Sequence, residues 1–419
     1  MSKELSYEEI SPYVFVTKLA GFEYSKYIQP FATKETINKN DIPMVQGKNI
    51  RNGAFVEKYD WFIKKEISDS LPRSVLNKKC ILIPYVGSNL GEVGIFHNKY
   101  VCHLASNIAK VELNSDRYLL EYLMYYMQSK IGQSYLFQAK QGSSQPNITM
   151  ESIRKTKIIK RTINEQKEIV KILSSIDNQI NRNNEMVQKL QVLAQAIYTR
   201  WFLQFEFPNE GGKPYKSSGG KMVWNDELNR EIPEGWKVKN IKELCDVTWG
   251  QCPDGNNILP LYTKENNTIK YCSGAGDMRN GLLVDCQAKT NASKRYADKG
   301  DILMSVAGSI GALAIVDEKI SLGRAAMAFT PKKCTKLFAY LAIQSLVDRI
   351  KQVASGSIQK VISDNHIDDM NLPYDEIIFK MFEKYNRVIE EQIVLSKESK
   401  MLTSLRNYLL PLLINGQLK

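Results

Sequence analysis

The sequence from Leu173 to Trp201 reads LSSIDNQINRNNEMVQKLQVLAQAIYTRW, and its apolar residues recur at alternating steps of three and four. The resulting seam comprises Leu173, Ile176, Ile180, Asn183, Val187, Leu190, Ala194, Ile197 and Trp201. Such a seam is typical of a coiled coil, although the buried face of an ordinary helix gives the same spacing. We therefore predict a long helix from about residue 164 to residue 204.

A second long helix is predicted near the carboxyl end, from about residue 376 to residue 413. Its apolar residues fall every seven positions, at Met381, Val388, Leu395, Leu402 and Leu409, with Leu405 and Leu412 beside them. Because two matching seams favour mutual packing, we expect an antiparallel coiled coil and a pseudo-two-fold relation between the two halves of the chain. Asn183, the only polar residue in the first seam, would set the register at some cost in stability.

The segments that precede the two helices share the same motifs in the same order. In the first half these are Ile50-Arg51-Asn52-Gly53, Cys80-Ile81-Leu82-Ile83, Gly87-Ser88 with Gly91, and Gly142-Ser143-Ser144-Gln145-Pro146-Asn147-Ile148. In the second half they are Met278-Arg279-Asn280-Gly281, Asp301-Ile302-Leu303-Met304, Gly308-Ser309 with Gly311, and Gly356-Ser357-Ile358-Gln359-Lys360-Val361-Ile362. A repeat of this length indicates two duplicated domains and not a solenoid.

Short strand-like runs mixed with single helices indicate that each duplicated segment is α+β. Strands are predicted at residues 79–86, 94–96, 108–113, 301–306 and 312–316, and helices near residues 118–129 and 337–352. We divide the chain into a first globular domain, the first long helix, a connector, a second globular domain and the second long helix. Their boundaries are residues 1–157, 158–206, 207–235, 236–373 and 374–419.

The composition favours a cytoplasmic protein that binds a polyanion. The chain of 419 residues carries a formal net charge of +12, the usual footprint of a nucleic-acid partner. No apolar run is long enough to span a bilayer, and the first residues do not resemble a signal peptide. Seven cysteines without a C-x-x-C pair, and only three histidines, indicate reduced thiols and no metal site.

Lysine and arginine residues occur beside amides and hydroxyls in the predicted loops. Contacts to phosphate position a protein on DNA, whereas guanidinium and amide groups read base edges. Arg51 and Arg279 hold equivalent positions in the two halves and are the main candidates. The full set of expected DNA-binding residues is Lys48, Asn49, Arg51, Asn52, Gln141, Ser143, Ser144, Gln145, Asn147, Arg279, Asn280, Lys294, Arg295, Ser357, Gln359 and Lys360.

The connector carries the sequence FPNEGGKPYKSSGGKMVW at Phe207–Trp224, followed by Leu228, Arg230, Ile232-Pro233 and Gly235-Trp236. It resembles the central connector of the specificity subunits of type I restriction-modification systems. The run GDILMSVAGSIG at Gly300–Gly311 and the Gly-Ser-x-x-x-x-Ile turn in both halves are similar to that family as well. The resemblance extends over essentially the whole chain.

This resemblance implies a subunit that reads double-stranded DNA and has no active site of its own. Its two globular domains would be target-recognition domains for the two halves of a split, asymmetric sequence. The helices would recruit two methyltransferase (M) subunits and, for restriction, the R subunits. S-adenosylmethionine would belong to the methyltransferase partner, and ATP and Mg to the restriction partner.

Two functions of other classes remain as alternatives. A self-contained DNA methyltransferase or nuclease is one of them, because Asn371-Leu372-Pro373-Tyr374 is similar to a base-holding motif of adenine methyltransferases, although one proline is missing. Pro253-Asp254 with Asp317-Glu318-Lys319 loosely matches the carboxylates of metal-dependent nucleases. A scaffold that binds only proteins would use the same helices but would not need paired basic loops. The glycines at 87–91 and 308–311 are interpreted as turn residues and not as a phosphate loop.

Overall fold

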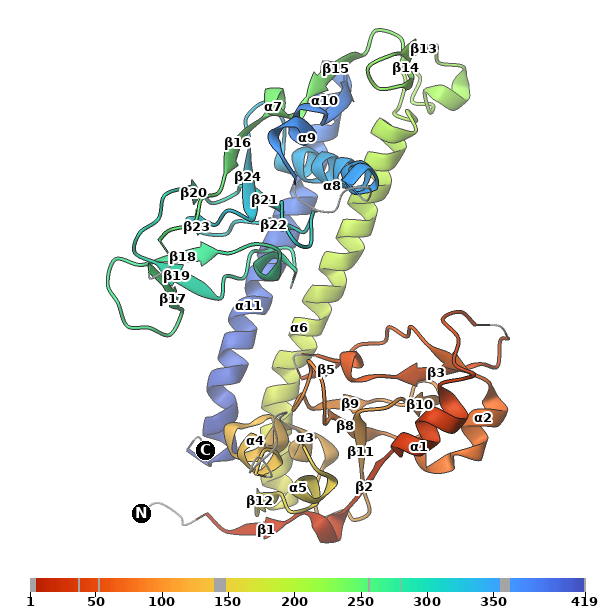
Figure 1. The fold of residues 1–419 in the computed structure, drawn as a ribbon, viewed down its shortest axis with the longest axis vertical. Helices are drawn as coiled ribbons and strands as arrows, with labels where there is room; N and C mark the ends of the chain where they lie inside the picture. The colour runs from red at the N-terminus through yellow and green to blue at the C-terminus, as the bar shows by residue number, and fades with distance from the viewer. Residues whose placement is uncertain are drawn as a thin grey trace. The chain divides into compact units, whose positions relative to one another are not determined.

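The computed structural model describes residues 5–36, 38–51, 53–138, 148–254, 257–279, 281–354 and 362–417. The chain divides into two compact units (Figure 1). Unit 1 consists of Met1–Asn178 with Thr403–Lys419, and unit 2 is Gln179–Leu402. The long helices α6 (Ile163–Tyr198) and α11 (Arg387–Ile414) therefore contribute to both units. Among the described residues, no helix is both long and apolar enough to cross a membrane.

The core of unit 1 is built on two β-sheets. The first has the order β2 (Val14–Lys18), β11 (Ile108–Leu113), β8 (Cys80–Pro84) and β9 (Gly94–Phe96), with all pairs antiparallel. The second has the order β6 (Phe62–Ile63), β3 (Ile42–Val45), β10 (Cys102–Leu104) and β7 (Val75–Leu76), with β3 and β10 parallel. Strand β8 is buried on both faces, because Ile81 and Ile83 join one apolar cluster while Cys80 and Leu82 join another.

Unit 2 repeats this topology. Its first sheet has the order β16 (Cys245–Trp249), β24 (Ala326–Pro331), β21 (Ile302–Ser305) and β22 (Leu313–Ile315), again antiparallel throughout. Its second sheet has the order β17 (Ile258–Pro260), β19 (Ala288–Thr290), β18 (Ile269–Cys272), β23 (Ile320–Leu322) and β20 (Tyr296–Ala297), with β18 and β23 parallel. The α+β class and the duplication predicted from the sequence are thus confirmed.

Short helices and two-stranded ribbons complete each unit. In unit 1 these are β1 (Tyr7–Glu9) paired with β12 (Lys157–Ile159), and helices α1 (Gly21–Glu23), α2 (Lys65–Ser70), α3 (Leu120–Gln128), α4 (Lys130–Leu136) and α5 (Met150–Arg154). In unit 2 they are β15 (Lys237–Asn240) paired with β25 (Asn371–Tyr374), and helices α7 (Ile241–Leu244), α8 (Lys336–Ala354), α9 (Asp364–Asp368) and α10 (Glu376–Glu383). The ribbons β1–β12 and β15–β25 occupy the same place in the two copies. The predicted strands and single helices all have counterparts here.

The connector is an ordered part of unit 2. It contains a 3₁₀ turn at Lys216–Ser218 and the hairpin of β13 (Met222–Asn225) and β14 (Arg230–Pro233). The Phe207 ring stacks with those of Tyr215 and Trp236, at centroid distances of 4.8 and 5.2 Å. The turn residues 210–213 are exposed, whereas Phe207 is buried in the core of the unit.

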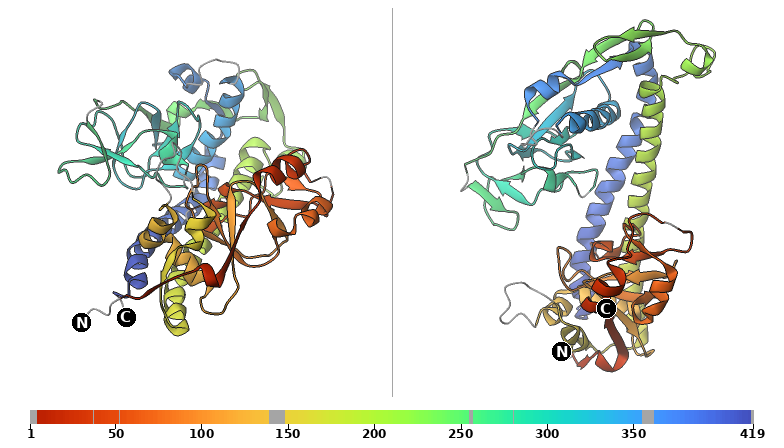
Figure 2. Two further views of the ribbon diagram at one scale, coloured as in Figure 1. Left: turned by 60° about the horizontal axis from the view of Figure 1, so that its bottom comes forward. Right: turned by 45° about the vertical axis from the view of Figure 1, so that its right-hand side comes forward.

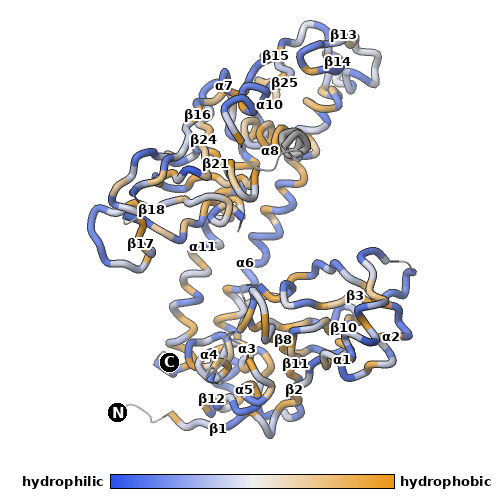
Figure 3. Tube along the Cα trace, in the orientation of Figure 1, coloured by the Kyte–Doolittle hydropathy of each residue, from blue (hydrophilic) through white to orange (hydrophobic). Residues whose placement is uncertain are grey.

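Helices α6 and α11 run antiparallel within each unit (Figures 1 and 2). In unit 1 the Arg406 guanidinium pairs with Asp177 at 3.1 Å, and Arg161 donates to the carbonyl of Ile414 at 3.0 Å. In unit 2 the buried Gln392 amide donates to the carbonyl of Val187 at 3.0 Å and to Gln191 Oε1 at 3.2 Å. Hydrophobic and hydrophilic stretches alternate along both helices in Figure 3, as expected for elements with one buried face.

The buried face of α6 agrees with its predicted seam, whereas that of α11 agrees only in part. On α6, Leu173, Ile176, Asn183 and Ala194 are buried, and Ile180, Val187, Leu190 and Ile197 are half-buried. On α11 the buried positions include Ile389, Gln392 and Ser399, each next to or between predicted seam residues. The predicted residues Val388, Leu395, Leu402 and Leu409 are only half-buried.

Two expectations for the second helix are therefore wrong. Leu405 is 44% exposed and does not belong to the buried seam. The helix also does not run unbroken from residue 376, because α10 ends at Glu383 and a 3₁₀ turn at Lys384–Asn386 precedes α11. The cause of the first error is that polar residues occupy part of the buried face of α11, so the heptad of leucines does not mark it.

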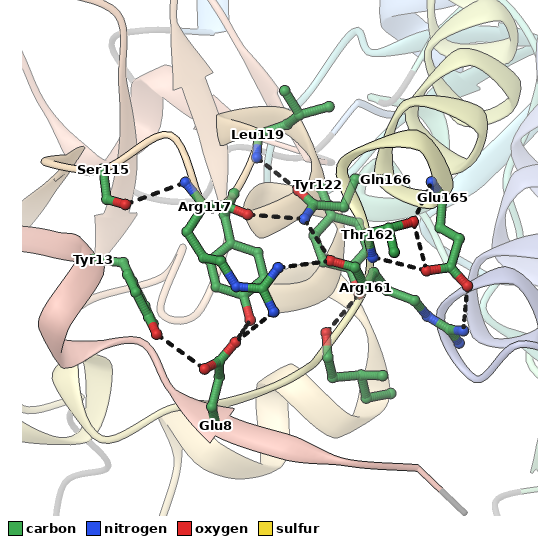
Figure 4. Close-up of polar contacts among 12 residues, drawn as sticks. Glu8, Tyr13, Ser115, Arg117, Leu119, Tyr122, Arg161, Thr162, Glu165 and Gln166 are labelled. Atoms are coloured by element: carbon green, nitrogen blue, oxygen red, sulfur yellow. Dashed lines mark hydrogen bonds and ion pairs between the residues drawn. The ribbon is translucent and has the colours of Figure 1, made fainter. Parts of the chain in front are cut away.

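A polar network fixes the start of α6 in unit 1 (Figure 4). The buried Gln166 side chain accepts from the amide of Leu119 at 2.8 Å and donates to the carbonyls of Arg117 and Arg161 at 3.1 Å. Arg117 also pairs with Glu8 on β1 at 3.0 Å. Burial by itself would raise the pKa of Glu8, but hydrogen bonds from two tyrosines and the Arg117 charge outweigh burial and lower it below its usual value.

An aromatic cluster holds the other end of α6 in unit 2. The Phe202 ring, which follows α6 in a π-turn at Thr199–Leu203, is fully buried. Its centroid lies 5.0 Å from Phe338, 5.3 Å from Phe379 and 5.1 Å from Phe382. These contacts join α6 to α8 and α10.

We expect Phe202→Ala to destabilise unit 2 by about 3–5 kcal/mol, because it removes a buried ring and leaves a cavity between three elements. The measurement is urea-induced unfolding of the full chain. Val192→Ala is the control, since Val192 is 70% exposed on α6 and its truncation should change stability by no more than about 0.5 kcal/mol. Equal effects of the two substitutions would contradict this account of the core.

Candidate nucleic-acid interface

Six of the expected DNA-binding residues lie in the described part of the chain. They are Lys48, Asn49, Arg51, Arg279, Lys294 and Arg295. The other ten lie outside the described residues, and they are Asn52, Gln141, Ser143, Ser144, Gln145, Asn147, Asn280, Ser357, Gln359 and Lys360. The geometry of the interface is therefore built from the first six and from the side chains that surround them.

Arg51 is carried by a short hairpin of unit 1. Strands β4 (Ile50–Arg51) and β5 (Ala54–Phe55) pair antiparallel, so that Arg51 faces Ala54 across a two-residue turn. Asn-Gly is the residue pair that such turns favour, and Gly53 adopts a left-handed φ of 75°. Arg51 is exposed, and among the described residues its guanidinium has no ion-pair partner. The side chain is thus available to a base or a phosphate.

Arg279 occupies the equivalent place in unit 2. It directly follows a 3₁₀ turn at Ala275–Met278, which comes after β18. In unit 1 a 3₁₀ turn at Gly47–Asn49 comes after β3 and leads into Arg51. Because β3 and β18 are the matching strands of the two copies, both arginines leave the same point of the shared topology. Arg279 is also exposed.

A buried polar side chain precedes each arginine by two positions. Asn49 is 1% exposed, its amide donates to the carbonyls of Val56 and Lys58 at 2.8 Å, and its oxygen accepts from the amide of Gln46 at 2.8 Å. Asn49 therefore organises its loop, and the expectation that it contacts DNA is wrong. The reason is that its whole side chain is used inside the protein.

Asp277 is the counterpart of Asn49, and the sequence analysis missed it. It is 3% exposed, and its carboxylate accepts from the amide and hydroxyl of Ser273 at 2.7 Å and from the amide of Gln287 at 3.2 Å. The signal that could have revealed it is an acidic residue at the repeat position of Asn49 inside an otherwise basic loop. Each unit thus anchors its arginine loop with a buried side chain, but with different hydrogen-bonding chemistry.

The remaining cations lie on the surface, and two of them form weak ion pairs. Lys48 pairs with Asp60, and Lys294 pairs with Asp254 at 3.2 Å. Both pairs are exposed, and exposed pairs contribute at most about 1 kcal/mol, so a phosphate could replace either carboxylate. Arg295 is exposed beside Lys294, and its carbonyl accepts from the amide of Leu322 at 2.9 Å.

Within the described ranges, the residues of the catalytic motifs considered in the sequence contact different partners. Asn371–Tyr374 forms strand β25, and the Asn371 oxygen accepts from the Asn240 amide at 2.7 Å. Asp254, Asp317 and Glu318 pair with Lys294, Lys400 and Lys270 respectively, so these carboxylates do not share a partner. In the part of the chain that the structure describes, no three metal-ligating side chains are grouped. The glycines at 87, 91, 308 and 311 all have left-handed φ values, as turn residues do.

Comparison with known proteins places these features in a family. The model of the type I restriction modification DNA specificity domain matches residues 26–193 and 233–394, which together make up most of the chain. The chain belongs to this specificity family. Each match covers most of one copy of the topology, and the first extends through most of α6 while the second reaches the start of α11.

Individual relatives are distant. The putative type I restriction enzyme MjaX specificity subunit of Methanocaldococcus jannaschii is 24% identical over 353 residues, or 81% of this chain and 78% of the relative. The HindI specificity subunit of Haemophilus influenzae is 22% identical over 372 residues, covering 74% of this chain and 79% of the relative. The type I restriction-modification S subunit of M. genitalium has a similar fold, with a TM-score of 0.54, 16% identity and coverage of 98% and 96% of the two chains.

If Arg51 and Arg279 read bases, Arg51→Ala and Arg279→Ala should each cost about 1–3 kcal/mol of binding and relax one base position. A role limited to phosphate would instead weaken binding to all sequences alike and flatten its salt dependence. Competition between randomised duplexes at several salt concentrations separates the two cases. Arg182→Ala, an exposed arginine on α6, is the control. Unchanged DNA affinity in both variants would exclude the two arginines from the interface.

Proposed function

We propose that this chain is the specificity subunit of a type I restriction-modification complex and that it reads a two-part, asymmetric sequence in double-stranded DNA. The observation that carries the proposal is the duplicated topology with an exposed arginine at the same point of each copy, Arg51 and Arg279. Each copy of the topology can read one half-site. Because the loops of the copies differ in sequence and in their buried anchors, Asn49 and Asp277, the two half-sites are expected to differ.

Electrostatics supports DNA as the partner. The net charge of +12 attracts a polyanion, and the exposed lysines near the arginines supply phosphate contacts that any sequence would satisfy. The arginines add base contacts, most often to the O6 and N7 atoms of guanine. Affinity and specificity are thereby assigned to different side chains.

The helices supply a surface for protein partners. Large apolar side chains remain exposed along α6, including Met186, Val192 and Leu193, and along α11, including Met401 and Tyr408. Exposed apolar side chains on a helix can bind a partner protein. We assign these helices to two methyltransferase subunits and, in restriction, to R subunits. S-adenosylmethionine would be bound by the methyltransferase partner, and ATP and Mg by the restriction partner, while this chain carries out no catalysis.

Exchange of one domain tests whether each half of the chain reads one half-site. Residues 1–160 are to be replaced by the matching part of another family member, with the junction after β12 because β1 pairs with β12. Methylation mapped across a genome should then show one changed half-site and one unchanged half-site. A change in both half-sites would contradict the two-domain reading. Methylation by the chain without its methyltransferase partner would favour the alternative of a self-contained enzyme.

A second test concerns the distance between the half-sites. Helix α6 has 36 residues, which corresponds to about 54 Å, and a DNA groove repeats about every 34–36 Å. Inserting one heptad after Val187 and a matching heptad after Leu395 should keep the helix pairing and lengthen the helices by about 10 Å, or roughly three base pairs. We expect a longer spacer between unchanged half-sites. An unchanged spacer in a complex that still methylates DNA would show that other elements set the distance.

A further inference from the structure

The hairpin that carries Arg51 is too small to hold its own shape. Each of its strands, β4 and β5, contains two residues. An isolated two-stranded hairpin is at best marginally stable in water, even when it is longer than this one. The conformation of the hairpin must therefore depend on contacts with the rest of unit 1.

Three side chains from neighbouring elements hold the hairpin backbone. Asn89, in the turn between β8 and β9, donates to the carbonyl of Ile50 at 2.7 Å. Glu92, in the same turn, accepts from the amide of Gly53 at 2.9 Å. Gln128, at the end of α3, donates to the carbonyl of Gly53 at 3.0 Å and to that of Val93 at 2.8 Å. Backbone groups on both sides of Arg51 are thus bound by side chains.

The side of the hairpin that packs against the core is also constrained. Ile50 is fully buried in the apolar cluster between the two sheets. Gly94 on β9 lies so close that a Cβ atom there would be 3.2 Å from Ile50 Cγ2 and 3.3 Å from the Ala54 carbonyl carbon. A Cβ on Gly53 would lie 2.7 Å from the Gln128 side chain. The hairpin therefore packs closely against β9 and against the Gln128 side chain.

A fixed hairpin backbone matters for an arginine that reads a base, but not for a cation that only attracts a phosphate. A cation that only attracts phosphate works on a flexible tether, as the exposed Lys48 can. An arginine that reads guanine must place two N–H groups opposite O6 and N7 at the same time, which requires a backbone held to about 0.5 Å. Three polar side chains that hold a hairpin with only two residues in each strand fit the second requirement.

We propose that Asn89, Glu92 and Gln128 are positioning residues that hold the β4–β5 hairpin so that Arg51 reads a G·C pair in the half-site of unit 1. The inference rests on the proposed function, because it requires that unit 1 reads DNA. It adds the base pair that Arg51 recognises and the side chains that determine its recognition. None of the three side chains needs to touch DNA.

The test compares Glu92→Leu, Glu92→Gln, Arg51→Ala and the double variant Glu92→Leu/Arg51→Ala in the full chain, co-expressed with the methyltransferase subunit. Glu92→Leu removes the acceptor for the Gly53 amide, whereas Glu92→Gln keeps an oxygen at the same distance along the side chain. Glu151→Leu on α5 is the matched control, because Glu151 is an exposed carboxylate of the same unit. The readout is the sequence preference of each complex on a library of randomised duplexes, with urea unfolding of each variant as a check on the fold.

We expect the wild type to prefer guanine at one position of one half-site, and Glu92→Leu to reduce that preference roughly tenfold without affecting the other half-site. Arg51→Ala should relax the same position. The double variant should lose no more than Arg51→Ala alone, because Glu92 acts through Arg51. Glu92→Gln and Glu151→Leu should keep the wild-type preference.

The possible failures are distinguishable. If the wild-type complex bound all duplexes alike, the proposed function itself would be wrong. If the wild type is selective and Glu92→Leu keeps its profile, or loses preference evenly over the half-site, the positioning role is overturned while the function stands. Additive losses in the double variant would likewise show that Glu92 acts independently of Arg51.

Discussion

The antiparallel pairing of α6 with α11 is the contact on which both units depend. In unit 1, Leu413 and Ile414 from the end of the chain enter the same apolar cluster as Ile169 and Leu173 of α6. In unit 2, Ile389 of α11 shares a cluster with Ala194 and Trp201. Each core is therefore completed by residues that are distant in sequence. The long helices are part of both cores and not merely a linker between domains.

The interface between the helices also contains polar groups, which limit how the helices can slide. The fully buried Gln392 binds the carbonyl of Val187 and the side chain of Gln191. A one-turn shift would leave this amide buried without its partners, at a cost of about 1–3 kcal/mol. A purely apolar seam has no comparable penalty, since one leucine can replace another. Polar residues on the buried face of α11 thus give the pairing a defined register.

The two copies of the topology show how one frame can present different loops. The strands that the two copies share keep the same order, with β17 as an additional edge strand in unit 2, and the 3₁₀ turn after the matching strand keeps its place. The anchor inside the turn changes from an amide that both donates and accepts, Asn49, to a carboxylate that only accepts, Asp277. Because the anchor differs, the loop backbone around each arginine can differ while the frame remains intact. Duplication followed by such local changes fits the proposed reading of two different half-sites.

Repeated motifs in one order determined the duplication. Local periodicities determined the element types and the buried face of α6, because apolar residues at period two or at steps of three and four leave few alternatives. Period alone did not locate the buried face of α11, where Gln392 and Ser399 are buried and Leu405 is exposed. That choice depends on hydrogen bonds to α6, which a hydrophobic pattern does not encode. The same applies to Asn49, which the sequence placed among the DNA contacts and the tertiary structure uses to hold a loop. Whether a polar side chain faces solvent or the backbone of its own protein depends on which carbonyls and amides the fold brings within 3 Å, and only the tertiary structure determines that.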